Sequence, residues 1–239
     1  VLRTPVCLTI KVLKFERSIH GIVRSFTPLG QSEDLTSYRA DVVPWLLFLS
    51  LSSDCKIFQH LSVPEIVEQV FSGLGYSDYQ MKLVKPYPKR LFCVQYRESH
   101  LSFVSRLLEE EGIFYFFEHS SKKHVLILAD DNSAFKACPG QSASRMATTA
   151  ASWQEEAVVM TCECEDAVHT GKVTLRDYDY DQPMLSLESA VTGKEPEEAY
   201  GYPGGYTTLE EGERYARLQL EAEEAQRQVI RATSTCRAF

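Results

Sequence analysis

The amino-acid sequence predicts an α+β fold that is mainly β. Short runs of β-branched and aromatic residues recur in both halves of the chain, and 11% of all residues are aromatic. Two segments near the middle combine helical spacing of apolar residues with helix-capping residues. A pair of apolar runs around a polar turn predicts a hairpin between them. The 239 residues suffice for two domains of ordinary size.

The composition is that of a folded protein with an acidic surface. Hydrophobic residues make up 44% of the chain, which is close to the globular norm and indicates a sizeable core. The net charge is −8, and no basic stripe of the kind used to bind nucleic acids is present. We therefore expect no nucleic-acid partner and attribute the negative charge to solubility.

The cysteine pattern and the first ten residues indicate the cellular compartment in which the protein is made. An odd number of cysteines at irregular spacing argues against a disulfide framework and indicates reduced thiols. The seven are Cys7, Cys55, Cys93, Cys138, Cys162, Cys164 and Cys236. Residues 1–10 lack the features of a secretory signal. The most apolar stretch, 42–51, is far shorter than the ~20 residues of a membrane span. Any export would therefore use a route that reads no N-terminal signal.

The first half of the chain predicts strands followed by a capped helix. Residues 1–29 have the pattern of strands, and 36–51 predict one or two more. Ser62 and Glu65 then have the spacing of a capping box, and Pro64 fits the first helical turn. The apolar stripe of this helix consists of Val63, Ile66, Val67, Val70, Phe71 and Leu74, with Gly73 and Gly75 as candidate terminators.

A second helix and a hairpin follow. Residues 76–90 contain prolines and predict a loop, and 91–96 predict a short strand. Ser99 can cap a helix that runs to Glu111 and ends at Gly112. The apolar stripe of this helix consists of Leu101, Phe103, Val104, Leu107 and Leu108. The hairpin joins the apolar runs 113–118 and 125–130 through a polar turn.

The second half returns to strands and ends in a helix. Residues 134–152 are rich in Ala, Ser, Thr and Gly and predict a linker or mobile loop. Strand patterns follow at 157–164 and 172–180. Thr208 and Glu211 form another capping box, and the helix after them is expected to reach about residue 230. Its apolar face is thin, as in a helix that packs on one neighbour only.

An aspartate-rich run is the first candidate metal site. Asp177, Asp179 and Asp181 have the spacing that opens a calcium loop, and Glu188 falls at the twelfth position. Gln182, however, stands where such a loop needs glycine for its sharp turn. Alternation along a strand would instead place the three carboxylates on one face. We therefore favour a solvated strand face over a calcium site.

The other candidate sites are weaker. Cys162 and Cys164 precede His169, but a zinc site normally uses a C-x-x-C pair, and alternation would place both thiols on one strand face as small core or interface residues. The three glutamates 109–111 point in different directions around a helix and are expected in solvent. Neither a nucleophile elbow nor a phosphate-binding loop is present. We expect no catalytic residue, no metal and no cofactor, and hence no enzyme.

Four groups of residues together resemble the valine–glycine repeat protein G (VgrG) family of type VI secretion spike proteins. The most specific is CVQYRESHLSFVSRLLEEEGIFYFFEH at 93–119. The matching segments are 20–23, 42–71, 93–119 with 124–130, and 172–183 with 200–222. Their order and spacing also fit, and the resemblance extends over nearly the whole chain.

The resemblance implies a hub similar to the baseplate hub of contractile-tail phages. It implies two β-barrel-like domains with a helix-containing middle section, and three chains that form a ring. The domains would be an incomplete first barrel at 1–58, a middle α+β section at 59–135, a linker or mobile loop at 136–152, and a second barrel with a C-terminal helix at 153–239. The family's needle would follow and is expected to be missing here.

The implied function is structural. The ring would cap the hexameric tail-tube protein Hcp and carry the puncturing needle, with baseplate components and effector proteins as further partners and membrane contact only through the needle. The protein would assemble in the bacterial cytoplasm and leave through the type VI system, to the extracellular space or a target cell. An alternative is a metal- or glycan-binding module of a secreted effector. The last helix and the aromatic hairpin are candidates for contacts between chains. The hairpin candidates are Ile113, Phe114, Tyr115, Phe116 and Phe117.

Overall fold

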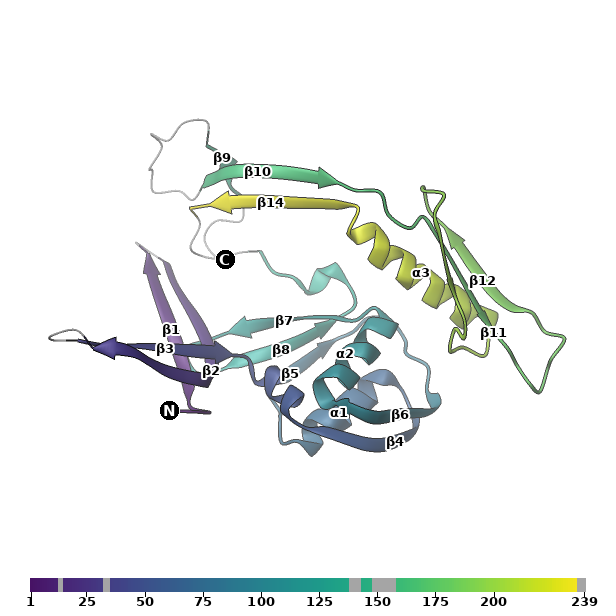
Figure 1. The fold of residues 1–239 in the computed structure, drawn as a ribbon, viewed down its shortest axis with the longest axis horizontal. Helices are drawn as coiled ribbons and strands as arrows, with labels where there is room; N and C mark the ends of the chain where they lie inside the picture. Colours follow the sequence, from purple (N-terminus) through teal and green to yellow (C-terminus); the bar gives the residue numbers. More distant parts are fainter. Residues whose placement is uncertain (13–14, 32–34, 138–142, 148–157, 236–239) are drawn as a thin grey trace. The chain divides into compact units, whose positions relative to one another are not determined.

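The computed structural model consists mostly of strands, with three α-helices and two 3-10 helices among the described residues (Figure 1). The described residues are 1–12, 15–31, 35–137, 143–147 and 158–235. The chain divides between residues 140 and 141 into two compact units, unit 1 and unit 2. This division falls inside the predicted linker at 136–152, part of which lies outside the described residues. The mainly β fold is confirmed, whereas the four-part division into domains stays a prediction.

Unit 1 begins with a three-stranded antiparallel sheet. Its order is β1-β2-β3, with β1 (Pro5–Val12), β2 (Phe15–Gln31) and β3 (Thr36–Val43). The register between β2 and β3 shifts twice, after Val23 and after Pro28. Shifts of this kind add local bend and twist, which suits a strand as long as β2. The strands predicted over 1–29 are confirmed.

The apolar run after β3 is a 3-10 helix, η1 (Trp45–Leu51). The prediction of one or two strands over 36–51 is therefore confirmed for β3 and was wrong for the apolar run after it. Trp45, Leu46 and Leu49 are all buried in it. Leu49 follows Leu46 by three residues and Trp45 by four, and both spacings bring side chains to one side of a helix, whereas a strand would turn successive side chains to opposite faces. The packing of these three side chains against the core decides the conformation.

The first predicted helix is confirmed as α1 (Val63–Gly73). The backbone N–H of Ser62 donates to Glu65 Oε2 at 2.7 Å, which completes the predicted capping box. This hydrogen bond also lowers the pKa of the Glu65 carboxyl. Gly75 follows the helix with φ of +82°, a conformation that few other residues adopt. Five residues of the predicted stripe are buried, namely Val63, Ile66, Val67, Val70 and Phe71.

The second predicted helix is confirmed as α2 (His100–Glu111). Ser99 Oγ accepts a hydrogen bond from the Ser102 N–H at 3.0 Å, as expected for its cap. Gly112 ends the helix in the left-handed conformation, with φ of +68°. The helix buries Phe103, Val104, Leu107 and Leu108, as its stripe predicted, and it also buries Glu111.

The remaining strands of unit 1 form two small sheets. β4 (Ser53–Leu61) pairs antiparallel with β6 (Arg90–Ser99). The predicted hairpin is confirmed as β7 (Phe114–His119) and β8 (His124–Ala129). β5 (Tyr79–Lys82) adds to β8 in parallel, inside the segment predicted to be a loop. The polar residues and prolines around β5 concealed it from the sequence pattern, because its pairing with β8 is long-range.

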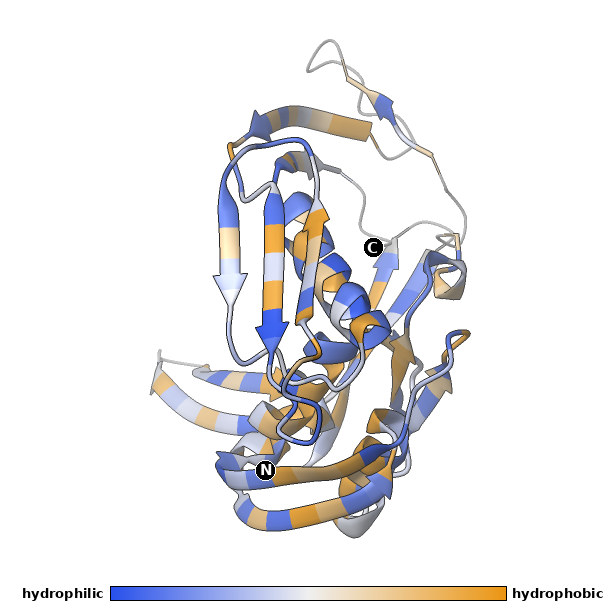
Figure 2. Ribbon diagram, turned by 90° about the vertical axis from the view of Figure 1, so that its right-hand side faces the viewer, coloured by the Kyte–Doolittle hydropathy of each residue, from blue (hydrophilic) through white to orange (hydrophobic). Residues whose placement is uncertain are grey.

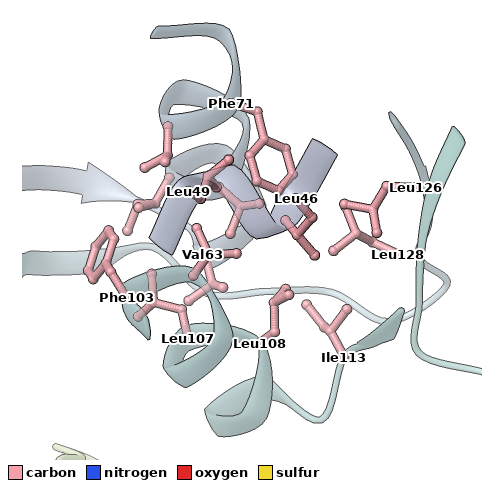
Figure 3. Packing of buried hydrophobic residues seen from close by; sticks show 14 of the residues in the cluster. Leu46, Leu49, Val63, Phe71, Phe103, Leu107, Leu108, Ile113, Leu126 and Leu128 are labelled. Carbon is pink, nitrogen blue, oxygen red and sulfur yellow. The ribbon is translucent and has the colours of Figure 1, made fainter. Parts of the chain in front are cut away.

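One core joins the helices, η1 and both small sheets of unit 1 (Figure 3). Phe103 of α2 stacks on Phe58 of β4 with ring centroids 5.5 Å apart. Trp45 of η1 stacks on Tyr76 at 4.5 Å and meets the edge of Phe71 in α1 at 5.1 Å. Stacked and edge-to-face contacts of this kind add to the stabilisation from burial. The labelled side chains in Figure 3 converge on this core from α1, α2, η1 and β8, with Ile113 from the segment between α2 and β7.

Unit 2 contains a second, smaller core. β11 (Lys172–Asp177) lies between β12 (Leu187–Thr192), antiparallel to it, and β13 (Glu198–Gly201), parallel to it. α3 (Leu209–Ala225) packs on β11 and β12. The buried residues of this core are Val173, Leu175, Leu187, Tyr206, Ala216 and Leu220. Each sheet of the described residues has two or three strands, and none of these closes into a barrel.

The last helix ends earlier than predicted. α3 stops at Ala225, and a strand, β14 (Gln228–Ser234), follows where the helix was expected to reach residue 230. β14 pairs antiparallel with β10 (Val158–Asp166), which also pairs in parallel with the two-residue β9 (Arg145–Met146). Val229 and Ile230 are β-branched and favour this strand. The cap at Thr208 is confirmed by its hydrogen bond from the Glu211 N–H at 3.3 Å.

The expectation that residues 109–111 all lie in solvent was wrong for Glu111. This side chain is 1% exposed and pairs with Arg90 of β6 at 2.7 Å. The same guanidinium reaches Glu110 at 2.7 Å, and Glu110 also pairs with Arg106 at 3.1 Å. Arg90 therefore offsets the unfavourable placement of carboxylates at the end of α2 and ties that helix to β6.

Removal of Arg90 should strongly destabilise unit 1. Arg90→Ala leaves the Glu111 carboxylate buried without its counter-ion, which costs about 3–5 kcal/mol of unfolding free energy. Arg106→Ala is the matched control, because its side chain is 43% exposed and its pairs are worth about 0–1 kcal/mol. Urea unfolding of both variants would measure the difference. Equal midpoints for the two variants would contradict the role of Arg90.

Candidate assembly surfaces

The predicted contact residues of the hairpin lie in different environments. Ile113 is buried in the core of unit 1, and Phe117 packs against that core. Phe114 and Phe116 lie on the other face of β7, where the ring of Phe135 stacks on both at 5.2 and 5.0 Å. Tyr115 is the most exposed of the five, at 42%. Within this run, Tyr115 therefore offers the largest free surface, and the role of the run in contacts between chains stays a prediction.

A larger apolar surface lies on the sheet of β4 and β6. Cross-strand pairs share a face, and the outward pairs are Cys55 with Tyr96, Ile57 with Val94, and Gln59 with Phe92. We call these six residues the β4–β6 outer face. Ile57, Phe92 and Tyr96 are each 63–64% exposed.

The opposite face of the same sheet is already buried. Phe58 and Cys93 pair across the strands and belong to the core. A sheet with one solvated face normally alternates apolar and polar residues, as the bands in Figure 2 show along several strands. β6 instead has the continuous run Leu-Phe-Cys-Val at 91–94, a pattern typical of a strand covered on both faces. This run was the sequence signal for the outer face, and our interpretation of 91–96 as a simple strand missed it.

The pair β10–β14 in unit 2 forms a second uncovered surface. Cys162 pairs with Ala232, and Cys164 pairs with Ile230, so these four small or apolar side chains share one face. We call them the ribbon apolar face. All four are exposed, and β9 covers the edge of β10 only at Val158 and Val159. The prediction that both thiols share a strand face is confirmed.

The other face of β10–β14 is polar. Thr161 lies opposite Thr233, and Glu163 lies opposite Arg231. The Arg231 guanidinium forms an ion pair with Glu165. The ribbon is thus amphipathic, although solvent reaches both of its faces in the single chain. A two-stranded sheet is only marginally stable in water unless another layer covers it. The ribbon apolar face is therefore suited to a partner surface.

The aspartate run holds a turn. The expected alternation of its three carboxylates along a strand was wrong, because β11 ends at Asp177. Asp177 Oδ2 accepts hydrogen bonds from Gly205 N–H at 2.6 Å and Tyr206 N–H at 3.3 Å. Asp179 Oδ1 accepts from the N–H groups of Asp181 and Gln182. Asx turns of this kind use the carboxylates as local backbone acceptors.

The described residues hold no group of three or more His, Cys, Asp or Glu side chains that could bind a metal ion. In the same parts of the chain, no helix combines the length and hydropathy needed to cross a membrane. Beside the aspartate turn lies an open hollow of about 500 Å³, lined by Tyr178, Met184, Tyr200 and Tyr202 among others. Three tyrosine rings make this hollow largely aromatic.

Large exposed apolar sheet faces are typical of proteins that assemble with other chains. The comparisons with known proteins agree with this class. The chain belongs to the phage tail baseplate hub (GPD) family, whose sequence profile matches residues 1–239.

Relatives from one bacterium specify the branch of the family. The type VI secretion system spike protein VgrG1a of Pseudomonas aeruginosa is 37% identical over 228 residues, and VgrG1b of the same organism is 35% identical. Each alignment covers 93% of this chain but only 36% and 31% of the relative. The chain thus spans about a third of the length of these relatives, and the resemblance to VgrG is confirmed.

Solved structures show the same fold. An E. coli protein, c3393, described as a component of the type VI secretion system with similarity to the T4 tail proteins gp27 and gp5, has a TM-score of 0.69. It is 21% identical, and the match covers 97% of this chain and 51% of that one. The tail protein from Neisseria meningitidis has a TM-score of 0.63 at 10% identity, over 90% of this chain and 65% of that one.

Thiol labelling should separate the surface cysteines from the core cysteine. Cys7, Cys55, Cys162 and Cys164 are exposed, whereas Cys93 is buried and burial raises the pKa of its thiol. Because the thiolate is the reactive form, iodoacetamide at pH 7.5 should modify these four exposed thiols at least about tenfold faster than Cys93. Mass spectrometry of the labelled peptides would measure the rates. Equal labelling of Cys93 in the folded protein would contradict the packing of β6 on the core.

Proposed function

We propose that the chain is the hub of a type VI secretion spike. Three copies form a ring, and the two units supply two barrel-like hub domains to each copy. The ring caps the hexameric tail-tube protein Hcp and carries the puncturing needle that delivers effectors. Family membership and the 37% identity to VgrG1a support this proposal.

The observation that carries the proposal is the β4–β6 outer face. A single chain leaves Ile57, Phe92 and Tyr96 more than half exposed on a rigid sheet whose other side is core. Aromatic side chains on a rigid support are typical centres of protein interfaces. In a ring of identical chains, this face meets a different surface of the next copy, and rotation by one third of a turn closes the ring. The ribbon apolar face and Tyr115 are the other contact candidates.

The proposed role is structural. The actin cross-linking toxin VgrG1 of Vibrio cholerae is 31% identical, but the chain corresponds to only 19% of it. The activity in that name belongs to the relative, and we assign none to this chain. We further propose that the hub assembles in the bacterial cytoplasm with baseplate components and leaves through the type VI system. The extracellular space or a target cell is its destination.

A substitution on the β4–β6 outer face should weaken the trimer without unfolding the chain. Phe92→Ser removes a ring that is 63% exposed, so folding loses little. An interface centre of this kind contributes about 2 kcal/mol or more per contact, which weakens assembly about 30-fold. Light scattering over a concentration series, on the longest protein that contains this chain, would measure the loss.

Leu91→Ser is the matched control. Leu91 is the neighbouring residue on β6, is 68% exposed and does not belong to the β4–β6 outer face. We expect it to leave the oligomeric state unchanged. A monomeric parent protein at micromolar concentration would overturn the trimer, whereas equal effects of the two variants would overturn the choice of face.

A further inference from the structure

A network of histidines joins separate parts of unit 1. His20 lies in the first half of β2, and His119 and His124 lie at the turn between β7 and β8. His20 and His124 are buried, and their Nδ1 atoms are 2.9 Å apart. The N–H of Trp45, the first residue of η1, donates to His124 Nε2 at 2.9 Å. The network thus connects the β1–β3 sheet, the hairpin and η1.

The hydrogen bonds assign one proton arrangement to the two rings. His124 Nε2 accepts from a backbone N–H, so it must carry its lone pair. The neutral ring then has its proton on Nδ1, and this N–H donates to His20 Nδ1. His20 in turn carries its own proton on Nε2. No other arrangement of two neutral rings satisfies both contacts.

An added proton has no place on the paired rings of His20 and His124. On His124, it would occupy Nε2 and point at the Trp45 N–H. On His20, it would occupy Nδ1 and point at the His124 Nδ1–H. If the proton on His124 moved to Nε2 to relieve this second conflict, it would restore the first. Every protonated form therefore sets two N–H donors against each other and loses one buried hydrogen bond.

The surrounding charges offer little compensation. Burial, together with the neighbouring His20 and His119, lowers the pKa of His124 to about 4. The Asp78 carboxylate, beside β5, acts in the opposite direction but already pairs with Lys123 at 2.7 Å. Burial also lowers the pKa of His119; the contact of its ring with the His20 backbone acts in the opposite direction, and Arg17 of β2 acts in the same direction as burial. η1 contributes no charged side chain.

We propose that His20 and His124 form an acid-sensitive latch. The latch holds the β1–β3 sheet against the β7–β8 hairpin and η1 while both rings are neutral, and it releases the sheet when His124 takes up a proton. This inference concerns the stability of one junction inside unit 1, and it does not rest on the proposed hub function.

The direction of the pH effect follows from proton uptake. The released His124 titrates near 6.5 and the latched ring near 4, so the released state binds more protons between these values. The latch is therefore at full strength above pH 6.5 and weakens as the pH falls toward 4. Over this range the equilibrium for release rises on the order of a hundredfold.

Hydrogen exchange tests the latch. Exchange rates of β2 amides around His20 and of β6 amides are measured in the same protein at pH 7.0 and 4.5. Each rate is corrected for the intrinsic exchange rate at that pH. The quantity compared is the ratio of the corrected β2 rate to the corrected β6 rate. We expect this ratio to rise at least about tenfold at the lower pH. In His124→Gln, whose side chain can accept from Trp45 N–H but does not titrate, the ratio should stay constant. His60→Gln is the control on the exposed His60 of β4 and should behave as the parent protein.

Two results would overturn the proposal. The first is a ratio in the parent protein that does not change between the two pH values. The second is a full pH response in His124→Gln. Should that variant fail to fold, nitrogen-15 NMR of the parent protein decides instead: a proton on His124 Nε2 at pH 7 would refute the latch, and a proton on Nδ1 would support it.

Discussion

The packing of α2 against β4 and β6 is the contact on which the rest of unit 1 depends. Phe103 stacks on Phe58, and Arg90 reaches from β6 to the carboxylates at the end of the helix. Together they fix a sheet of only two strands, which could not hold its shape alone. The same contact presents the β4–β6 outer face as a rigid surface. The packing of α2 against β4 and β6 therefore stabilises unit 1 and also keeps the β4–β6 outer face exposed.

Both units leave an apolar sheet face exposed, but the residues on the two faces differ. Each sheet of the described residues has at most three strands, and the β4–β6 pair and the β10–β14 pair each leave an apolar face exposed. In unit 1 the uncovered face is aromatic, and in unit 2 it carries small thiols and aliphatic groups. Covering an exposed apolar face with another surface removes it from water, which favours association.

The sequence was most informative where structure is local. The caps at Ser62, Ser99 and Thr208 and the left-handed Gly112 each depend on residues a few positions away, and all were predicted. β5 and β14 were missed because their partners lie dozens of residues distant. The buried state of Glu111 was missed for the same reason, since Arg90 precedes it by 21 residues. The assembly surfaces were only partly visible, because exposure depends on which face the fold covers.

The antiparallel pairing of β10 and β14 has a topological consequence. These strands bracket residues 167–227, so the chain leaves the ribbon and returns to it at the same end. α3 and its sheet are therefore an insertion closed at its base by the pairing of Asp166 with Gln228. An insertion of this kind can be exchanged, enlarged or trimmed while the flanking strands keep their register. Variation between hub proteins can accumulate there at little cost to the framework.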